Sequence, residues 1–108
     1  MKFDHVALTV PKGNIEETVN WYVENLSADI RHLDETWALI SCNGTSIAFV
    51  IPSQHPPHIA FSLNDSEYEH FKNIGKVFKK HRDGSESFYE KDCQGNILEF
   101  LFWPQVSG

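Results

Sequence analysis

The chain repeats one sequence plan in its two halves, and this repeat is the strongest constraint on how it can fold. The matched segments are residues 4–10 with 57–63 and residues 41–44 with 92–95. His5 and His58 are 53 positions apart and Gly44 and Gly95 are 51 apart, so the offset is nearly constant. Each copy is too long for a solenoid repeat. We therefore expect a single domain of residues 1–108, with module one at about 1–53 and module two at about 54–104.

Both modules show the same predicted order of elements, a strand, a helix and three more strands. The elements expected in module one are strands at 3–10, 29–33, 36–41 and 45–51 and a helix from Asn14 to about Leu26. Those expected in module two are strands at 58–63, 76–78, 87–92 and 96–103 and a helix after Asn64, followed by a loose tail after Pro104. We expect Asn14 and Glu17 to form a capping box at the first helix. The pattern predicts an α+β fold of two βαβββ modules.

Composition excludes several classes of function. The formal charge of −6 argues against nonspecific nucleic-acid binding, which needs a basic surface. No apolar run is long enough to span a membrane, and the N-terminus lacks the features of a signal peptide. The only cysteines, Cys42 and Cys93, favour free thiols in a reducing cytoplasm over a disulfide framework. We expect a cytoplasmic protein that acts on a small molecule.

The last expected strand contains one acid, Glu99, among apolar residues, and a buried carboxylate needs a partner. Side chains alternate across a strand, so His5 and His58 each lie on the face opposite the bulky residues that should pack on a helix. The small side chains that share the histidine faces, and that we expect to line a substrate cavity, are Ala7, Thr9, Ala60 and Ser62. If the two modules face each other, the two histidines and Glu99 converge.

The turn before the last strand predicts a neighbour for Glu99. A three-residue loop, Cys93–Gly95, would place glycine at a left-handed position and pair Tyr89 with Glu99. A two-residue loop would instead pair Glu90 with Glu99, which is less favourable because it places two acids side by side. A three-residue loop at the equivalent turn of module one would pair Ala38 with Ala48. These two small side chains would leave open space at that position. Tyr89 is therefore either a substrate-binding or proton-donating residue, or a cross-strand aromatic filler.

Two neutral imidazoles and one carboxylate form a ligand set that holds a divalent metal and leaves positions open for substrate oxygens. Taken singly, His5 and His58 are better explained as buried, hydrogen-bonded histidines, and Glu99 as a structural ion-pair partner. Their matched positions in the repeat favour a metal site, for which Fe, Mn, Zn or Ni are all suitable. We assign metal binding to all three residues and catalysis to Glu99 and Tyr89.

Several other polar residues have simpler explanations. The basic run Lys79–Arg82 is either a solvated loop or a rim that attracts an anionic substrate. We interpret the remaining histidines as surface residues: His32, His55, His70 and His81.

At this point the chain resembles the vicinal oxygen chelate superfamily, which includes glyoxalase I, fosfomycin- and bleomycin-resistance proteins, methylmalonyl-CoA epimerase and extradiol dioxygenases. The resemblance spans residues 3 to 104 and is carried by Asp4–Leu8, Trp21-Tyr22 with Leu26, His58–Phe61 and, most specifically, Ser87–Phe100. It implies curled mixed sheets that form a metal-binding cleft. It also matches His5, His58 and Glu99 to the family's ligands, and Tyr89 to a substrate contact in fosfomycin-resistance proteins.

The sequence departs from the family pattern at three places. Cys93-Gln94 replaces Pro-Asp in the last turn, Ser27 replaces a glycine after the first helix, and Ala48 replaces the first-module acid or amide of glyoxalase I and the epimerase. The last change favours a three-ligand site over a four-ligand one. The resemblance implies a metal-dependent lyase, isomerase, transferase or dioxygenase, and often a homodimer.

Two alternatives to the enzyme stay open. One is a metal-free binding protein of the bleomycin-resistance type that sequesters a small molecule, and the other is a structural module with a filled cleft. The sequence also leaves open whether His5 and His58 meet within one chain or across two.

Overall fold

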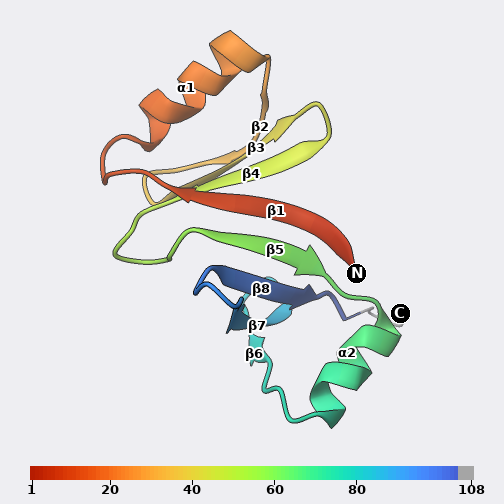
Figure 1. Cartoon of the computed structure of the whole chain (residues 1–108). Coiled ribbons are helices and arrows are strands. Elements are labelled where there is room, and N and C mark those ends of the chain that lie inside the picture. Colours follow the sequence, from red (N-terminus) through yellow and green to blue (C-terminus); the bar gives the residue numbers. More distant parts are fainter. Residues whose placement is uncertain (105–108) are drawn as a thin grey trace. The chain divides into compact units, whose positions relative to one another are not determined.

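Eight strands and two helices form the described part of the chain, residues 1–104 of a computed structural model (Figure 1). The fold is α+β, as predicted. Residues 105–108, which belong to the tail expected to be loose, lie outside the described residues. Within the described part, no helix is both long and apolar enough to cross a membrane.

The chain divides into two compact units, which are equivalent in construction. Within the described residues, the N-terminal unit comprises 5–58, and the C-terminal unit comprises 1–4 together with 59–104. The elements that begin in the first half are β1 (Lys2–Thr9), α1 (Ile15–Leu26), β2 (Asp29–Leu33), β3 (Trp37–Cys42) and β4 (Thr45–Val50). Those of the second half are β5 (His58–Ser62), α2 (Asp65–Asn73), β6 (Lys79–Lys80), β7 (Glu86–Lys91) and β8 (Ile97–Phe102).

Strand order confirms the two βαβββ modules. The first half has the order β2-β3-β4-β1 and the second has β6-β7-β8-β5, so equivalent strands occupy equivalent places. In each, the first strand is parallel to the last, and the remaining pairs are antiparallel. The strand predicted at 76–78 is wrong: pairing begins at Lys79, while Phe78 packs its ring against Tyr68 and Phe88.

The core of the N-terminal unit lies between α1 and the sheet. Val19 of α1 and Phe49 of β4 are almost completely buried, and Tyr22 packs against Phe49 with 5.0 Å between ring centroids. The whole cluster consists of Val10, Ile15, Val19, Ala28, Ala38, Ile40, Phe49 and Ile51. Helical spacing predicts an apolar face of Ile15, Val19, Tyr22 and Leu26 for α1, and the first three pack there, whereas Leu26 is 51% exposed.

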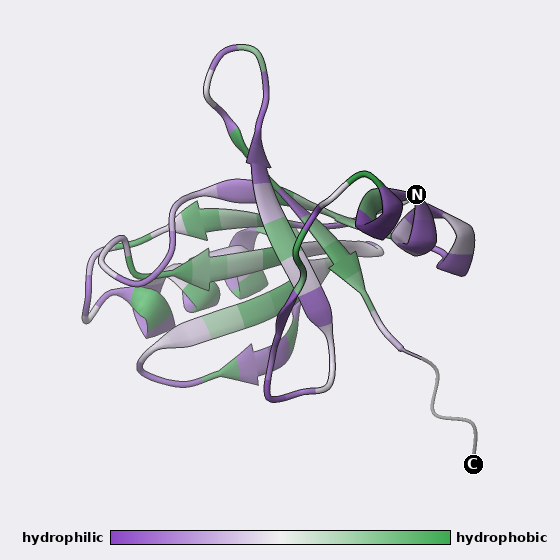
Figure 2. Cartoon of the chain, turned by 90° about the horizontal axis from the view of Figure 1, so that it is seen from below, coloured by the Kyte–Doolittle hydropathy of each residue, from purple (hydrophilic) through white to green (hydrophobic). Residues whose placement is uncertain are grey.

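Aromatic rings form the core of the C-terminal unit. Phe71 of α2 packs against Phe88 and Phe100, and Tyr68 stacks on Phe102 at 3.9 Å between ring centroids. Phe100 and Phe102, alternate residues of β8, therefore lie on the face that packs against α2. The rest of α2 is largely hydrophilic, as the purple ribbon of Figure 2 shows.

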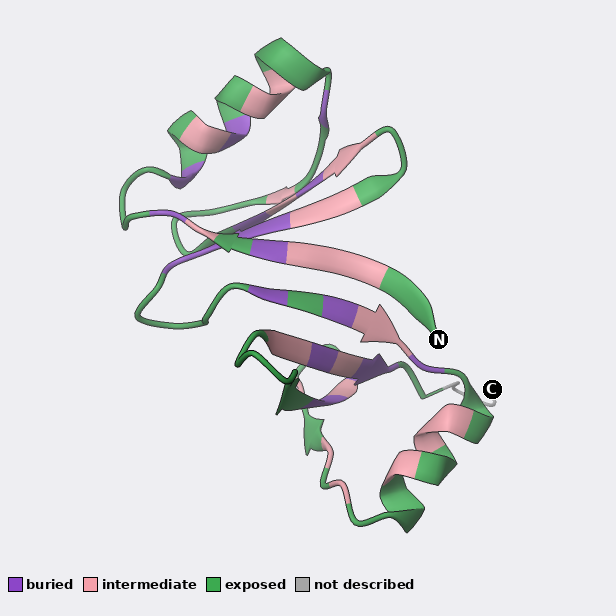
Figure 3. Ribbon diagram, in the orientation of Figure 1, coloured by how far each residue is buried: buried purple, intermediate pink, exposed green. Residues whose placement is uncertain are grey.

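Burial along β1 and β5, the first strand of each half, differs from the sequence prediction. Leu8 and Ile59 belong to the bulky faces expected to pack on helices, but they are 38% and 41% exposed. The alternation is visible along β5 in Figure 3, where Ile59 is exposed between two buried residues. The reason is that α1 packs mainly over β2, β3 and Phe49 of β4, and the α2 rings contact β7 and β8, so the main helix contacts lie away from β1 and β5.

The two hairpin turns also differ. The closing hairpin has the predicted three-residue loop, in which Asp92 N donates to Asn96 O and Gly95 has a φ of +87°. In the first half Cys42 pairs directly with Thr45, so the loop is Asn43-Gly44, and both of its residues have positive φ. This is the sequence pair that two-residue hairpins prefer. Ala48 is consequently opposite Leu39 and not opposite Ala38.

Candidate functional site

The two histidines meet within one chain. His5 comes from β1, and His58 is the first residue of β5, and both belong to the N-terminal unit. Their ring centroids are 5.6 Å apart at an interplanar angle of 73°, so the rings meet edge to face. His58 is buried, with 8% of its surface exposed, and His5 is half-buried. The two imidazoles therefore lie side by side in the single chain described here.

A hydrogen bond determines the tautomer of His58. Its Nδ1 lies 2.9 Å from the carbonyl oxygen of Pro56. Because a carbonyl oxygen only accepts, Nδ1 must carry the proton, and Nε2 of the neutral ring then keeps its lone pair. Pro56 and Pro57 have no backbone N–H groups, so neither can replace His58 as the donor in this hydrogen bond. Metal-binding histidines commonly show the same arrangement, in which one ring nitrogen donates to a carbonyl and the other keeps its lone pair.

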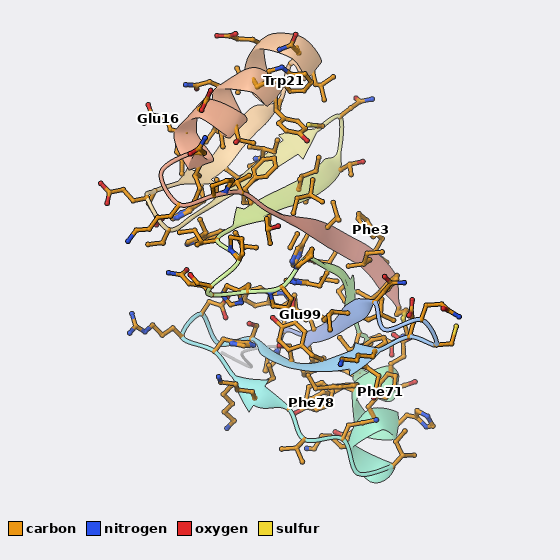
Figure 4. All side chains as sticks on the ribbon, turned by 60° about the vertical axis from the view of Figure 1, so that its left-hand side comes forward. Phe3, Glu16, Trp21, Phe71, Phe78 and Glu99 are labelled. Carbon is orange, nitrogen blue, oxygen red and sulfur yellow. The ribbon has the colours of Figure 1, made fainter. Side chains whose placement is uncertain are left out.

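The carboxylate of Glu99 is buried in the C-terminal unit. Only 7% of the residue is exposed, and the Ser87 hydroxyl donates to its Oε2 at 3.0 Å. Figure 4 shows Glu99 on the side of β7 and β8 away from Phe71 and Phe78, as alternation in β8 requires. A carboxyl group at this position offers oxygen atoms of the kind that bind cations.

Tyr89 is directly opposite Glu99 in the β7–β8 register, as predicted. Burial raises the pKa of Tyr89 to about 12, helped by the negative charge of Glu99 and a hydrogen bond to that carboxylate. All three causes favour the neutral phenol. The Tyr89 hydroxyl therefore keeps its proton near neutral pH and can act as a hydrogen-bond or proton donor.

The four small residues expected to line the cavity differ in exposure. Ala7 and Ala60 are completely buried, whereas Thr9 and Ser62 are half-buried. Ala7 packs in a small cluster with Ala48 and Val50. Contact of these residues with a substrate stays a prediction.

The sequence interpretation missed two residues near Glu99, Ser87 and His81. Ser87 is two positions before Tyr89, so alternation along the hairpin could have placed it beside Glu99. His81, interpreted as a surface residue, is half-buried, and its Nε2 lies 2.7 Å from the Ser87 hydroxyl. No pattern in the sequence points to His81, because a loop carries it there. Its neighbours Lys79 and Lys80 are exposed in β6.

Comparison with known structures identifies the fold. A glyoxalase/bleomycin resistance protein/dioxygenase superfamily member from Vibrio splendidus 12B01 matches with a TM-score of 0.68 and 11% identity, over 91% of this chain and 96% of its own. Methylmalonyl-CoA epimerase from Mycobacterium tuberculosis matches with a TM-score of 0.67 and 14% identity, over 96% and 89%. A Streptomyces coelicolor methylmalonyl-CoA epimerase in complex with 2-nitronate-propionyl-CoA matches with a TM-score of 0.68 and 15% identity, over 100% and 98%.

These neighbours belong to the vicinal oxygen chelate superfamily, and the resemblance predicted from the sequence is confirmed at the level of the fold. Neither a protein-family model nor a curated protein sequence matches the chain. The activity has to be argued from the residues themselves.

Proposed function

We propose that this protein is a small metal-dependent enzyme of the glyoxalase and dioxygenase type, whose substrate chelates a divalent ion through two neighbouring oxygens. His5, His58 and Glu99 are the described residues whose donor atoms could hold that ion together. The observation that carries the proposal is the hydrogen bond from His58 Nδ1 to Pro56 O, because it leaves Nε2 as a lone-pair donor beside a second imidazole.

The donor set fits a divalent transition metal. Two imidazoles and one carboxylate suit Fe, Mn, Zn or Ni and leave positions for substrate oxygens. When bound, such an ion supplies Lewis-acid chemistry that stabilises negative charge on substrate oxygens. This combination is compatible with a lyase, isomerase, transferase or dioxygenase reaction.

The surrounding side chains have separate roles in this proposal. Glu99 provides the negative charge of the site, and Ser87 holds its Oε2 in place. Tyr89, neutral at physiological pH, donates a hydrogen bond or a proton to the substrate. We assign the pocket lining to Ala7, Thr9, Ala60 and Ser62. A homodimer and a cytoplasmic location stay predictions from the sequence.

Metal analysis tests the proposal. Protein stripped with a chelator is dialysed against Mn²⁺, Fe²⁺, Zn²⁺ or Ni²⁺ and analysed for bound metal. We expect about one ion per chain with at least one of these metals, and loss of binding in His58→Ala and Glu99→Ala. His55→Ala is the matched control, because His55 is exposed in the loop before β5. Unchanged metal content in His58→Ala would reject the site.

A second measurement tests the vicinal-oxygen chemistry. Simple bidentate oxygen ligands, such as catechol, oxalate and acetohydroxamate, should raise the melting temperature of the metal-loaded protein and leave the metal-free protein unchanged. Equal stabilisation of both forms, insensitive to a chelator, would favour the metal-free binding protein instead.

A further inference from the structure

A chain of hydrogen bonds runs from the loop between β6 and β7 to the buried carboxylate of Glu99. His81 Nε2 lies 2.7 Å from Ser87 Oγ, and Ser87 Oγ donates to Glu99 Oε2 at 3.0 Å. Ser87, the middle residue of this series of hydrogen bonds, is 1% exposed, so solvent has almost no access to it. All three residues lie in the C-terminal unit.

The direction of each hydrogen bond follows from the number of protons available. Ser87 Oγ donates to Glu99 Oε2, so the single hydroxyl proton of Ser87 is already used in that bond. The Ser87 oxygen must then accept the other bond, which means that Nε2 of His81 carries a proton. In the neutral ring Nδ1 is therefore unprotonated. His58 has the opposite tautomer, because its Nδ1 is the atom bonded to a carbonyl.

The loop that carries His81 is itself closed by hydrogen bonds. The His81 amide donates to Ser85 O at 2.8 Å, and the Gly84 amide donates to His81 O at 3.1 Å. Asp83 Oδ1 accepts from both the amide and the hydroxyl of Ser85. These hydrogen bonds hold the pKa of Asp83 below its usual range, so this carboxylate stays ionised and the turn stays closed. The imidazole is thus presented to Ser87 by a constrained turn.

We infer that His81 is a positioning residue for Glu99, acting through Ser87. The last torsion of a glutamate side chain is broad, so the orientation of the Glu99 carboxylate depends on the groups that hydrogen-bond to it, which include Ser87 and Tyr89. The Ser87 hydroxyl fixes one oxygen of Glu99, and His81 prevents that hydroxyl from turning away. Partners of this kind behind a metal ligand commonly change metal affinity by about 10- to 100-fold. The inference rests on the proposed function, because the consequence of orienting Glu99 is tighter metal binding.

The test compares metal dissociation constants, measured by competition with a chromophoric chelator, for the intact protein and a set of variants. We expect His81→Ala and Ser87→Ala to bind about 10- to 100-fold more weakly. His81→Gln should recover part of the loss, since its amide can still donate to Ser87. His70→Ala, at an exposed position on α2, is the matched control and should bind like the parent. Circular dichroism verifies that each variant is folded.

Two further results separate positioning from a general structural role. The double variant His81→Ala/Ser87→Ala should bind no more weakly than Ser87→Ala alone, because both act on one path to Glu99. In metal-free protein, ¹⁵N NMR should report His81 with its proton on Nε2, and Ser87→Ala should disturb that signal. A proton on Nδ1, additive losses, or parent-like affinity in His81→Ala would overturn the inference while leaving the metal site intact. Absence of metal binding in the parent would reject the proposed function, and the inference with it.

Discussion

Ala48 in the first half of the chain is the structural counterpart of Glu99 in the second. Ala48 pairs with Ala7 across the parallel β1–β4 strands, and Glu99 pairs with Ala60 across β5–β8. Ala7 and Ala60 each lie two residues after a histidine, so the two pairs occupy the same position in the repeat. The duplicated fold thus provides two equivalent positions, and this sequence has a carboxylate at only one of them.

We expect Ala48→Glu to destabilise the metal-free protein by about 1–3 kcal/mol, since Ala48 is only 6% exposed and the new carboxylate would enter an apolar cluster. Added divalent metal should restore part of the loss, because the new acid shares a sheet face with His5. Ala48→Leu is the control that adds bulk without charge. Denaturant titration with and without metal measures both effects, and equal rescue of the two variants would contradict this account.

The raised pKa of Tyr89 predicts a specific pH dependence. The phenol has a folded-state pKa of about 12 and an ordinary value of 10.0. Between these values the unfolded chain has lost this proton and the folded chain has kept it, so the Tyr89 contribution falls as pH rises. Below pH 10 the contribution is fully present. We therefore expect the stability difference between the parent and Tyr89→Phe to change from pH 10 to 12, measured by denaturant unfolding. Parallel curves would contradict the assignment.

The two helix starts should respond differently to the same substitution. Asn64 forms a complete capping box with Glu67, whereas the Asn14 side chain makes no capping bond and donates to Glu17 instead. Asn64→Ala should cost about 1 kcal/mol of stability, and Asn14→Ala only a few tenths. Thermal unfolding of both variants checks this. Equal losses at the two positions would show that the first helix is capped after all.

Ser27 ends α1 in a left-handed conformation, with a φ of +53° and a ψ of +37°. Glycine adopts this conformation without the clash of a Cβ atom, so Ser27→Gly should stabilise the protein by about 0.5–1 kcal/mol. Ser53→Gly is the control, since Ser53 lies in a turn without a positive φ and should gain nothing. A loss of stability in Ser27→Gly would show that the serine has another role there.

The repeat made the fold predictable, because two matched halves predict two modules with the same order of elements. The Tyr89–Glu99 register followed separately, from the three-residue turn before the last strand. The prediction was wrong where the copies differ locally. Alignment of Gly44 with Gly95 could not show that one turn has two residues and the other three. Asn14 and Asn64 are each followed three residues later by a glutamate, so the sequence predicts a capping box at both. Only the backbone geometry shows that Asn64 caps its helix and Asn14 does not.

The sheet face that each candidate residue occupies was predictable in the same way. His5, His58 and Glu99 belong to strands, and the two-residue period of a strand determines which face each occupies. His81 belongs to a loop, where position depends on turn geometry and on hydrogen bonds such as that from Ser85 to Asp83. No periodicity encodes such a contact, so the second layer behind Glu99 required the structure.

The most direct test of the central claim is to count the imidazole nitrogens bound to a paramagnetic ion. Electron spin echo spectra of the Mn²⁺-loaded protein should show coupling to two histidine nitrogens, and either His5→Ala or His58→Ala should reduce the count to one or abolish binding. Spectra without histidine coupling, or two coupled nitrogens in both variants, would contradict a site built on His5, His58 and Glu99.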